Sequence, residues 1–341
     1  NFLTKCSAIF RENIGAKIIS ITGSCGKTTL KEMIGITLKK ISNTSYSPKS
    51  FNNKYGVPVS LLNLKQNDKF GVFEVGMDKK GEIDYLTKIT KPDLGIITNI
   101  SYAHSKNFRN INQIAEAKAE IMNNIKKGGT VILNIDDRFY QYHKNFAHRK
   151  KLKVISFGIR NKSAMTKLTK ISKIKNKYLL YIDVNGLLVS FYVNNINHSH
   201  LYNILATLAS IHLFIDIKKL KKNIFLNYKI PNGRGDVSKV KLKNKKIFLV
   251  DETYNSNPLS LKTAIENYDR IKLKRFKKYL LLGDMLELGK HSLKQHRLIS
   301  ETINKTKINQ VYVIGKYIKE TFKGLKTNKK AKILNNKINI I

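Results

Sequence analysis

Residues 17–39 of the chain read KIISITGSCGKTTLKEMIGITLK. The β-branched apolar run at residues 17–22 predicts a buried strand, and the apolar spacing over residues 30–38 predicts a helix. A strand, a tight turn that contains glycine, and a helix form the opening unit of a parallel α/β sheet. This stretch therefore predicts an α/β fold.

The turn between this strand and helix, TGSCGKTT, has the composition of a phosphate-binding loop. It is a short relative of the G-x-x-x-x-G-K-[ST] motif, because Ile21 stands where the longer motif has glycine. Glycines let successive backbone N–H groups face phosphate oxygens, and the helix N-terminus adds a favourable dipole. Lys27 would reach the β- and γ-phosphates, and the Thr28 hydroxyl would ligate Mg²⁺. We therefore predict a nucleotide site, rather than a turn that only starts a helix, made by Gly23, Ser24, Cys25, Gly26, Lys27, Thr28 and Thr29. Cys25 is interpreted as a small filler and not as a nucleophile.

The alternation of strands and helices continues along the chain. Further strands are expected at residues 70–75, 94–99 and 130–134, and helices at residues 81–89, 111–125 and 199–214. The short alternating runs KVISFGI, YLLYIDV and LLVSFYV, between residues 153 and 193, predict a small antiparallel meander at the edge of the sheet.

A second α/β unit is expected after Pro231-Asn232-Gly233, a sequence typical of a hinge. Its strands are expected at residues 246–250, 279–283 and 310–314. A length of 341 residues also favours two domains, at about 150 residues each. We therefore expect a first domain with a mostly parallel sheet over residues 1–229 and a second over residues 230–341.

The composition excludes several classes of protein. The chain has 64 Lys and Arg against 23 Asp and Glu, a formal charge of +41. Such a charge favours nucleic-acid binding, but the lysines are spread along the chain, accompany many Asn and Ile residues with A/T-rich codons, and form no RRM, zinc-finger or helix-turn-helix pattern. We therefore favour compositional drift and expect no dedicated nucleic-acid partner.

Apolar content and cysteine count exclude further classes of protein, namely disordered, membrane-spanning and disulfide-rich chains. An apolar content of 42% argues against a wholly disordered chain. No uncharged apolar run reaches the ~18 residues that span a bilayer, so an integral membrane protein is not expected. Two cysteines cannot build a disulfide framework. The sequence therefore predicts a cytoplasmic protein.

Polar residues follow the ends of the predicted strands, where ligands bind in open parallel sheets. Glu74 closes one strand, and a Mg²⁺ held together with Thr28 would offset the cost of burying it; pairing with a lysine is the alternative. His104 follows the next strand. It could ligate a metal, hydrogen-bond a phosphate or be an ordinary surface residue. Lys118 lies in the helix after it, and its spacing alone predicts an ordinary surface lysine.

A series of motifs then occurs in one order: TGSCGKTTLKE, NNKYGVP (52–58), EVGM (74–77), TNISYAH (98–104), AEAKAEI (115–121), DETYNSNP (251–258) and GDMLELG (283–289). From about residue 5 to about residue 316 this series resembles the Mur ligases of bacterial cell-wall synthesis. YNSNP and GDMLELG are typical of the branch that joins D-alanyl-D-alanine to UDP-N-acetylmuramoyl-tripeptide.

The resemblance implies a P-loop central ATPase domain, a C-terminal Rossmann-like α/β domain, and an ADP-forming peptide ligase that uses an acyl phosphate in peptidoglycan precursor synthesis. Its expected substrates are UDP-N-acetylmuramoyl-tripeptide and D-alanyl-D-alanine, its cofactors are ATP and two Mg²⁺ ions, and it would act as a monomer. The alternatives are another Mur or folylpolyglutamate-type ligase, a basic P-loop NTPase that binds nucleic acid, or a degenerate remnant.

The resemblance also implies roles for individual residues. Catalytic roles fall to Lys27, His104 and Lys118. The Mg²⁺ ligands would be Thr28, Glu74, His104 and Lys118, the last of them carbamylated. Besides the loop, ATP would be bound by Asn203, Arg234 and Asp251. The substrates would contact Asn52, Asn53, Tyr254, Asn255 and Asn257.

Three departures from the family pattern accompany the resemblance. The family motif H-N-x-x-N is matched only at Asn203, because Ser199 and His200 stand at its first two positions. Only 22 residues precede Gly23, so we expect this chain to lack the N-terminal uridine-binding domain. The usual closing Lys-Gly-Ser run is not found, so we expect the C-terminal domain to be incomplete.

Overall fold

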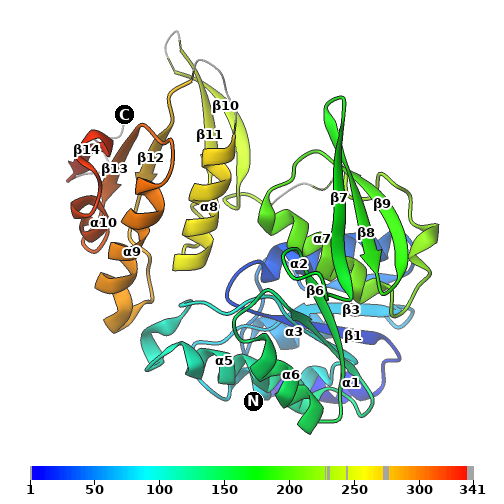
Figure 1. Ribbon diagram of the computed structural model, residues 1–341. Helices are drawn as coiled ribbons and strands as arrows, with labels where there is room; N and C mark the ends of the chain where they lie inside the picture. The colour runs from blue at the N-terminus through cyan, green and yellow to red at the C-terminus, as the bar shows by residue number, and fades with distance from the viewer. Residues whose placement is uncertain (1, 227, 229–230, 243–244, 272–275, 336–341) are drawn as a thin grey trace. The chain divides into compact units, whose positions relative to one another are not determined.

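A computed structural model describes residues 2–226, 228, 231–242, 245–271 and 276–335 (Figure 1). The chain forms two compact units, residues 1–100 with 108–229 and residues 101–107 with 230–341. The short segment 101–107 therefore packs with the second unit, although it lies between two stretches of the first. Residues 229 and 230, at the border of the two expected domains, lie outside the described residues.

The first unit is built on one sheet with strand order β2-β3-β1-β4-β5-β6-β7-β8-β9. Strands β1 to β7 pair in parallel, and β7, β8 and β9 pair antiparallel. Parallel strands need both faces covered, which explains their continuous apolar sequences. The strands are β1 (Lys17–Thr22), β2 (Thr44–Tyr46), β3 (Phe70–Glu74), β4 (Leu94–Ile97), β5 (Thr130–Asn134), β6 (Lys153–Gly158), β7 (Thr166–Ile174), β8 (Lys177–Val184) and β9 (Leu187–Val193).

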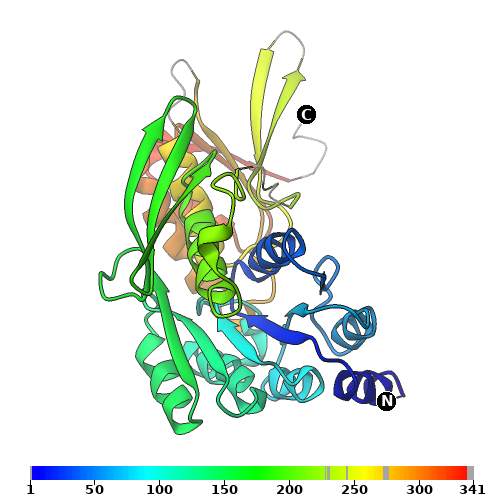
Figure 2. The ribbon, with the colours of Figure 1, turned by 90° about the vertical axis from the view of Figure 1, so that its right-hand side faces the viewer.

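Helices cover both faces of this sheet (Figures 1 and 2). Helices α2 (Lys27–Lys39) and α7 (His198–Ile211) pack together on one face. Leu30, Met33, Ile34 and Leu38 of α2 lie in this core, at the helical spacing that places them on one stripe. The other face carries α1 (Phe2–Glu12), α3 (Gly56–Leu62), α4 (Glu82–Thr90), α5 (Ile111–Ala119) and α6 (Tyr140–Arg149).

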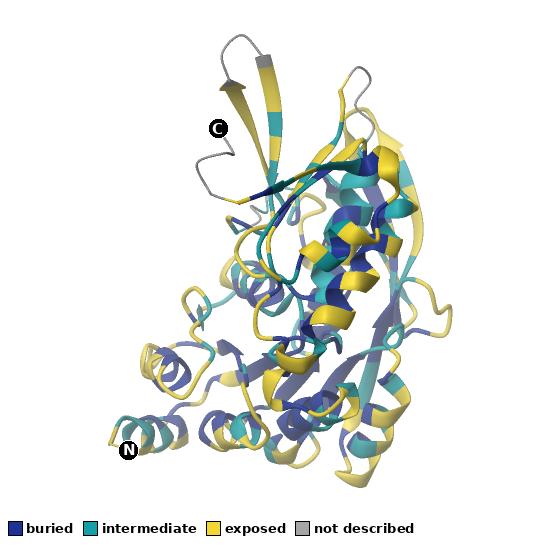
Figure 3. Ribbon diagram, turned by 90° about the vertical axis from the view of Figure 1, so that its left-hand side faces the viewer, coloured by how far each residue is buried: buried dark blue, intermediate teal, exposed yellow. Residues whose placement is uncertain are grey.

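The burial pattern follows from this layering, as Figure 3 shows by the dark strands between the helices. Alternate residues of β1 serve the two cores: Ile19 and Ile21 join the core under α2, whereas Ile18 joins a second core with Leu61 and Phe73. Each such side chain contributes roughly 1.5–3 kcal/mol when it leaves water. Both faces of β1 are therefore fixed, and so is the position of the loop at its end.

The second unit contains a two-stranded antiparallel sheet and a three-stranded parallel sheet. Helices α8 and α9 enclose its core with β12 and β13, through residues such as Ile265, Ile303 and Val313. Its elements are β10 (Asp236–Leu242), β11 (Lys245–Asp251), α8 (Pro258–Arg270), β12 (Tyr279–Leu282), α9 (Ser292–Asn304), β13 (Gln310–Ile314), α10 (Lys319–Lys323) and β14 (Lys330–Leu334).

These observations confirm the predicted fold class and correct two of its details. The meander is present as β7–β9, but KVISFGI is not part of it, because β6 pairs in parallel with β5. The helix predicted at 111–125 changes at Glu120 into a 3-10 helix, Glu120–Asn124. None of the described helices is long and apolar enough to cross a membrane.

Candidate active site

The two glycines of the phosphate loop adopt backbone conformations that other residues rarely take. Gly23 has φ +145° and Gly26 has φ +81°, the latter at the start of α2. A Cβ on Gly23 would lie 1.9 Å from the hydroxyl oxygen of Thr98. Glycine is therefore required at position 23 both by backbone strain and by space.

The end of strand β4 holds the loop from one side. The backbone N–H of Ser24 donates to the carbonyl of Asn99 at 2.9 Å, and that of Cys25 donates to Asn99 Oδ1, also at 2.9 Å. Thr98 Oγ1 donates to the carbonyl of Cys25 at 2.6 Å. Two N–H groups that we expected to face phosphate thus donate to Asn99, and phosphate binding at the N-terminus of α2 stays a prediction.

Two lysine side chains meet at the carbonyl of Gly23. Lys27 Nζ donates to this oxygen at 2.9 Å and Lys118 Nζ donates to it at 3.1 Å. Lys118 is only 2% exposed, so the surface position predicted from its spacing is wrong. Burial, and then the neighbouring charge of Lys27, lower the pKa of the Lys118 ammonium well below its ordinary value. The arrangement brings two amino groups to the loop at which nucleotide phosphate binding is predicted.

A carboxylate faces the same loop from the end of β3. Glu74 is 2% exposed; Thr28 Oγ1 donates to its Oε2 at 2.7 Å and Asn52 Nδ2 donates to its Oε1 at 2.7 Å. Both hydrogen-bond donors are neutral, and the charge of Glu74 also acts on the nearby Lys118, whose pKa it raises. A hydroxyl and a carboxylate side by side offer the oxygen ligands that Mg²⁺ prefers. The residues therefore fit the predicted metal.

Helix α7 approaches the loop through Asn203. Its Oδ1 lies 3.4 Å from the position that a Cβ on Gly26 would take, and the residue is 6% exposed. Tyr228, which follows α7 in the chain, also contacts the loop: its hydroxyl donates to the carbonyl of Thr29 at 3.0 Å. Asn203 thus lies against the phosphate loop, and its contact with adenine stays a prediction.

Of the two asparagines expected at the substrate, Asn52 contacts Glu74 as described, whereas Asn53 has a structural contact. Asn53 Oδ1 accepts from the backbone N–H groups of Tyr55 at 3.1 Å and Gly56 at 2.9 Å, where helix α3 begins. Such side-chain acceptors stabilise a helix start. The segment that carries both residues is therefore bonded to the end of β3 through Asn52 and to the start of α3 through Asn53.

The remaining predicted residues belong to the second unit. The Arg234 guanidinium lies over the ring of Tyr254, 4.1 Å from its centroid. Asp251 Oδ1 accepts from the backbone and hydroxyl of Thr253, which lowers the pKa of Asp251. Asn257 caps α8 by accepting from the N–H groups of Leu259 and Ser260 at 3.1 Å.

His104 lies in the segment 101–107 of the same unit, and its Nδ1 pairs with the carboxylate of Glu287. Asn255 is exposed in the loop between β11 and α8. Roles of all these residues at the phosphate loop stay predictions.

Sequence reasoning missed the aspartates that follow β5. Asp137 accepts from the backbone N–H of Ile100 at 2.8 Å and so holds the chain next to Asn99. Asp136 accepts from the hydroxyl of Tyr202 in α7 at 2.8 Å. The signal was a pair of acidic residues just beyond the strand at 130–134, because ligand-binding side chains are expected at and beyond the ends of parallel strands.

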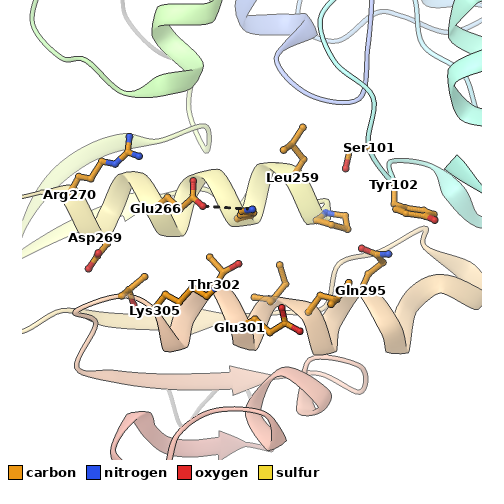
Figure 4. Close-up of a pocket in the computed structure, with 15 residues that line it drawn as sticks. Ser101, Tyr102, Leu259, Glu266, Asp269, Arg270, Gln295, Glu301, Thr302 and Lys305 are labelled. Atoms are coloured by element: carbon orange, nitrogen blue, oxygen red, sulfur yellow. Dashed lines mark ion pairs between the residues drawn. The ribbon is translucent and has the colours of Figure 1, made fainter. Parts of the chain in front are cut away.

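A cavity of about 620 Å³ lies in the second unit between α8 and α9 (Figure 4). Charges of both signs line it, among them Lys262, Glu266 and Asp269, and Lys262 pairs with Glu266 along α8. None of the residues predicted to act on the nucleotide lines this cavity. The candidate site is therefore the phosphate loop and the residues around it.

Comparison with known proteins decides the family. The model of the Mur ligase middle domain matches residues 21–211, more than half of the chain. The chain belongs to the Mur ligase family. The match confirms the resemblance drawn from the motifs, and Mur ligases are ATP-dependent amide ligases.

Individual Mur ligases agree over most of the chain. The UDP-N-acetylmuramoyl-tripeptide–D-alanyl-D-alanine ligase of Buchnera aphidicola (subsp. Acyrthosiphon pisum) is 36% identical over 310 residues, which cover 89% of this chain and 66% of that ligase. The ligase of the same name from Rickettsia prowazekii is 30% identical and covers 93% of this chain. The chain spans about two thirds of the length of the curated relatives it matches.

Solved Mur ligase structures share the fold. MurF from Acinetobacter baumannii has a TM-score of 0.87 at 26% identity, covering 97% of this chain and 70% of that one. MurF ligase from Thermotoga maritima in complex with ADP has a TM-score of 0.84 at 25% identity, covering 99% of this chain and 75% of that one.

Proposed function

We propose that this chain catalyses the ATP-dependent joining of D-alanyl-D-alanine to UDP-N-acetylmuramoyl-tripeptide. The observation that supports it best is the cluster around the phosphate loop. Lys27 and Lys118 meet at the carbonyl of Gly23, and the Thr28–Glu74 pair lies on the adjacent side of the loop. This cluster combines positive charge for phosphates with oxygen ligands for Mg²⁺.

The reaction needs ATP because a carboxylate is a poor acylating agent. Transfer of the γ-phosphoryl group would turn the terminal carboxylate of the tripeptide into an acyl phosphate, and the amine of D-alanyl-D-alanine would then displace phosphate. Lys27 would neutralise charge on the transferring group, while the N-terminal N–H groups of α2 orient the phosphates. Bound Mg²⁺ would add charge neutralisation at the same oxygens, held by Thr28 and Glu74.

The buried Lys118 amine has a property that suits the carbamylation implied by the family resemblance. A lysine amine must be neutral to react with carbon dioxide, and the lowered pKa of Lys118 raises the neutral fraction. Addition of carbon dioxide to the neutral amine, with release of one proton, would give an anionic carbamate whose oxygens could ligate a second Mg²⁺. We propose this role for Lys118, with His104 as a further ligand of that ion.

The second unit would complete both substrate sites. Arg234 and Asp251 are proposed to reach ATP, and Tyr254, Asn255 and Asn257 are proposed to lie at the peptide substrates. The motifs YNSNP and GDMLELG, and the names of the relatives in Buchnera and Rickettsia, support D-alanyl-D-alanine as the amine.

The test is phosphate release from Mg-ATP, with UDP-N-acetylmuramoyl-tripeptide and D-alanyl-D-alanine each present or omitted. We expect release that needs both substrates and that is lost in Lys27→Ala. Release with other amino acids as the amine would indicate a different ligase of this architecture, and stimulation by DNA or RNA would indicate a nucleic-acid-dependent NTPase. Normal turnover of Lys27→Ala would contradict the assignment of the phosphate loop.

A further inference from the structure

The second lysine of the motif TGSCGKTTLKE, Lys31, has no part in the mechanism above. It lies on α2, one helical turn beyond Lys27, and is 0% exposed. Its Nζ donates to the carbonyl of Ser47 and to the carbonyl of Lys49, both at 2.7 Å. Lysine is almost never fully buried unless its ammonium is paired, and these two hydrogen bonds supply that pairing.

The two carbonyls belong to the segment Ser47–Asn52, which passes beside the proposed Mg²⁺ ligands. Ser50 Oγ lies 3.3 Å from Thr28 Oγ1, and Asn52 Nδ2 donates to Glu74 at 2.7 Å. Asn52 is also fixed through its carbonyl, which accepts from the N–H of Gly76 at 2.8 Å. The segment therefore contacts both members of the Thr28–Glu74 pair.

The segment needs support, because part of its backbone is strained. Lys49 has φ +45°, in the left-handed region, which is unfavourable for a residue other than glycine. Charge-assisted hydrogen bonds from Lys31 to the carbonyls on either side of Pro48 can offset that cost. Glu32 Oε1, at 3.6 Å, and the ring of Tyr46, whose centroid lies at 5.7 Å, are further favourable neighbours of the ammonium.

We propose that Lys31 is a positioning residue that holds the segment Ser47–Asn52 against Thr28 and Glu74, and thereby orients the Glu74 carboxylate for Mg²⁺. The first half of this inference, that Lys31 holds the segment, concerns only the apo protein. The second half rests on the proposed nucleotide function. The alternative is that Lys31 only fills the space between α2 and the segment.

The first experiment uses the apo chain and trypsin. Lys49 and Lys54, both exposed, provide cleavage sites in and next to the segment. In Lys31→Met we expect cleavage at these two lysines to become about tenfold faster, because two buried charge-assisted hydrogen bonds are lost. Lys39→Met, which removes an exposed charge from the end of the same helix, is the matched control and should cleave like the wild type. An unchanged rate in Lys31→Met would overturn the first half.

The second experiment measures ADP affinity in EDTA and in saturating Mg²⁺, by calorimetry. In EDTA, Lys31→Met should bind ADP like the wild type. The gain in ADP affinity that Mg²⁺ provides should be about tenfold smaller in Lys31→Met than in the wild type. Leu38→Ala, a core substitution on the same helix, should lower the stability of the protein and keep the gain. If Leu38→Ala loses the gain equally, Lys31 is merely structural.

Asn52→Ala keeps the test decisive if Lys31→Met does not fold. Asn52 is partly exposed, and its removal cuts the contact through which the segment acts on Glu74. It should lose a similar part of the Mg²⁺ gain, and a normal gain would overturn the orienting role. Failure of the wild type to bind ADP at all would contradict the proposed function and the orienting role together, whereas the trypsin result would still decide whether Lys31 holds the segment.

Discussion

Lys118 and Lys27 place two amino groups on one backbone oxygen, an arrangement that is unfavourable while both are charged. A nucleotide phosphate or a carbamate on Lys118 would remove the repulsion. We expect Lys118→Ala to lower phosphate release at least about 100-fold, the cost of losing one preorganised charged contact. Bicarbonate should not restore it, because the alanine has no amine. Lys127→Ala, an exposed lysine nearby in the chain, is the control, and wild-type rates in Lys118→Ala would return Lys118 to a structural role.

At this scale the sequence indicated residues that act through local motifs and missed those that act through tertiary packing. The glycines, Lys27 and Thr28 follow from the spacing of one loop, and Glu74 follows from its place at a strand end. The burial of Lys118 depends on the phosphate loop, about 95 residues earlier in the chain. Asn99 bonds to the loop directly, and Asp137 holds the neighbouring Ile100; no spacing in the sequence reveals these contacts.

Helices α5 and α6 are joined by a histidine that stays neutral. His143 of α6 lies 3.0 Å through Nε2 from the carbonyl of Ala115 in α5, one turn before Lys118. Burial lowers the pKa of His143 to about 4, from 6.5. Between these values the unfolded chain binds more protons than the folded one, so stability rises with pH in this window and falls as the pH is lowered. The full difference is on the order of 3 kcal/mol.

We therefore expect the free energy of unfolding of the wild type to fall between pH 6.5 and pH 4, as measured by urea titration. His143→Gln keeps a hydrogen-bond donor but has no such protonation, so its pH dependence should be flatter by about 3 kcal/mol across the window. His200, whose pKa burial also lowers to about 4, stays in both proteins and supplies a common background. Equal slopes in the two proteins would refute the assignment to His143.

Among the elements, the parallel strands were predictable because burial on both faces makes them continuously apolar. Strands β1, β5 and β13 lie where their sequences predict. Helix α6, with the polar sequence YQYHKNFAHR, buries little beyond His143 and Ala147 and was missed. KVISFGI was placed in the meander because a strand's alternation does not say whether its neighbour runs parallel or antiparallel.

Each unit has a main hydrophobic core of its own among the described residues, the first under α2 and the second between α8 and α9. Calorimetry should therefore show two thermal transitions. Leu38→Ala, in the first core, should lower one of them, and Ile303→Ala, in the second core, should lower the other. These two variants assign the transitions without any assumption about how the units are arranged.

With the transitions assigned, Mg-ADP should stabilise the unit that contains the phosphate loop. At a free concentration 100 times its dissociation constant, a ligand adds about 2.7 kcal/mol, which raises the transition of a unit of this size by roughly 5–10 °C. The shift should appear in the transition lowered by Leu38→Ala and vanish in Lys27→Ala. A shift of the second transition as well, abolished by Arg234→Ala, is expected if Arg234 reaches the nucleotide as proposed. A shift confined to the second transition would contradict nucleotide binding at the phosphate loop, because the ligand can stabilise only the unit whose folded form it binds.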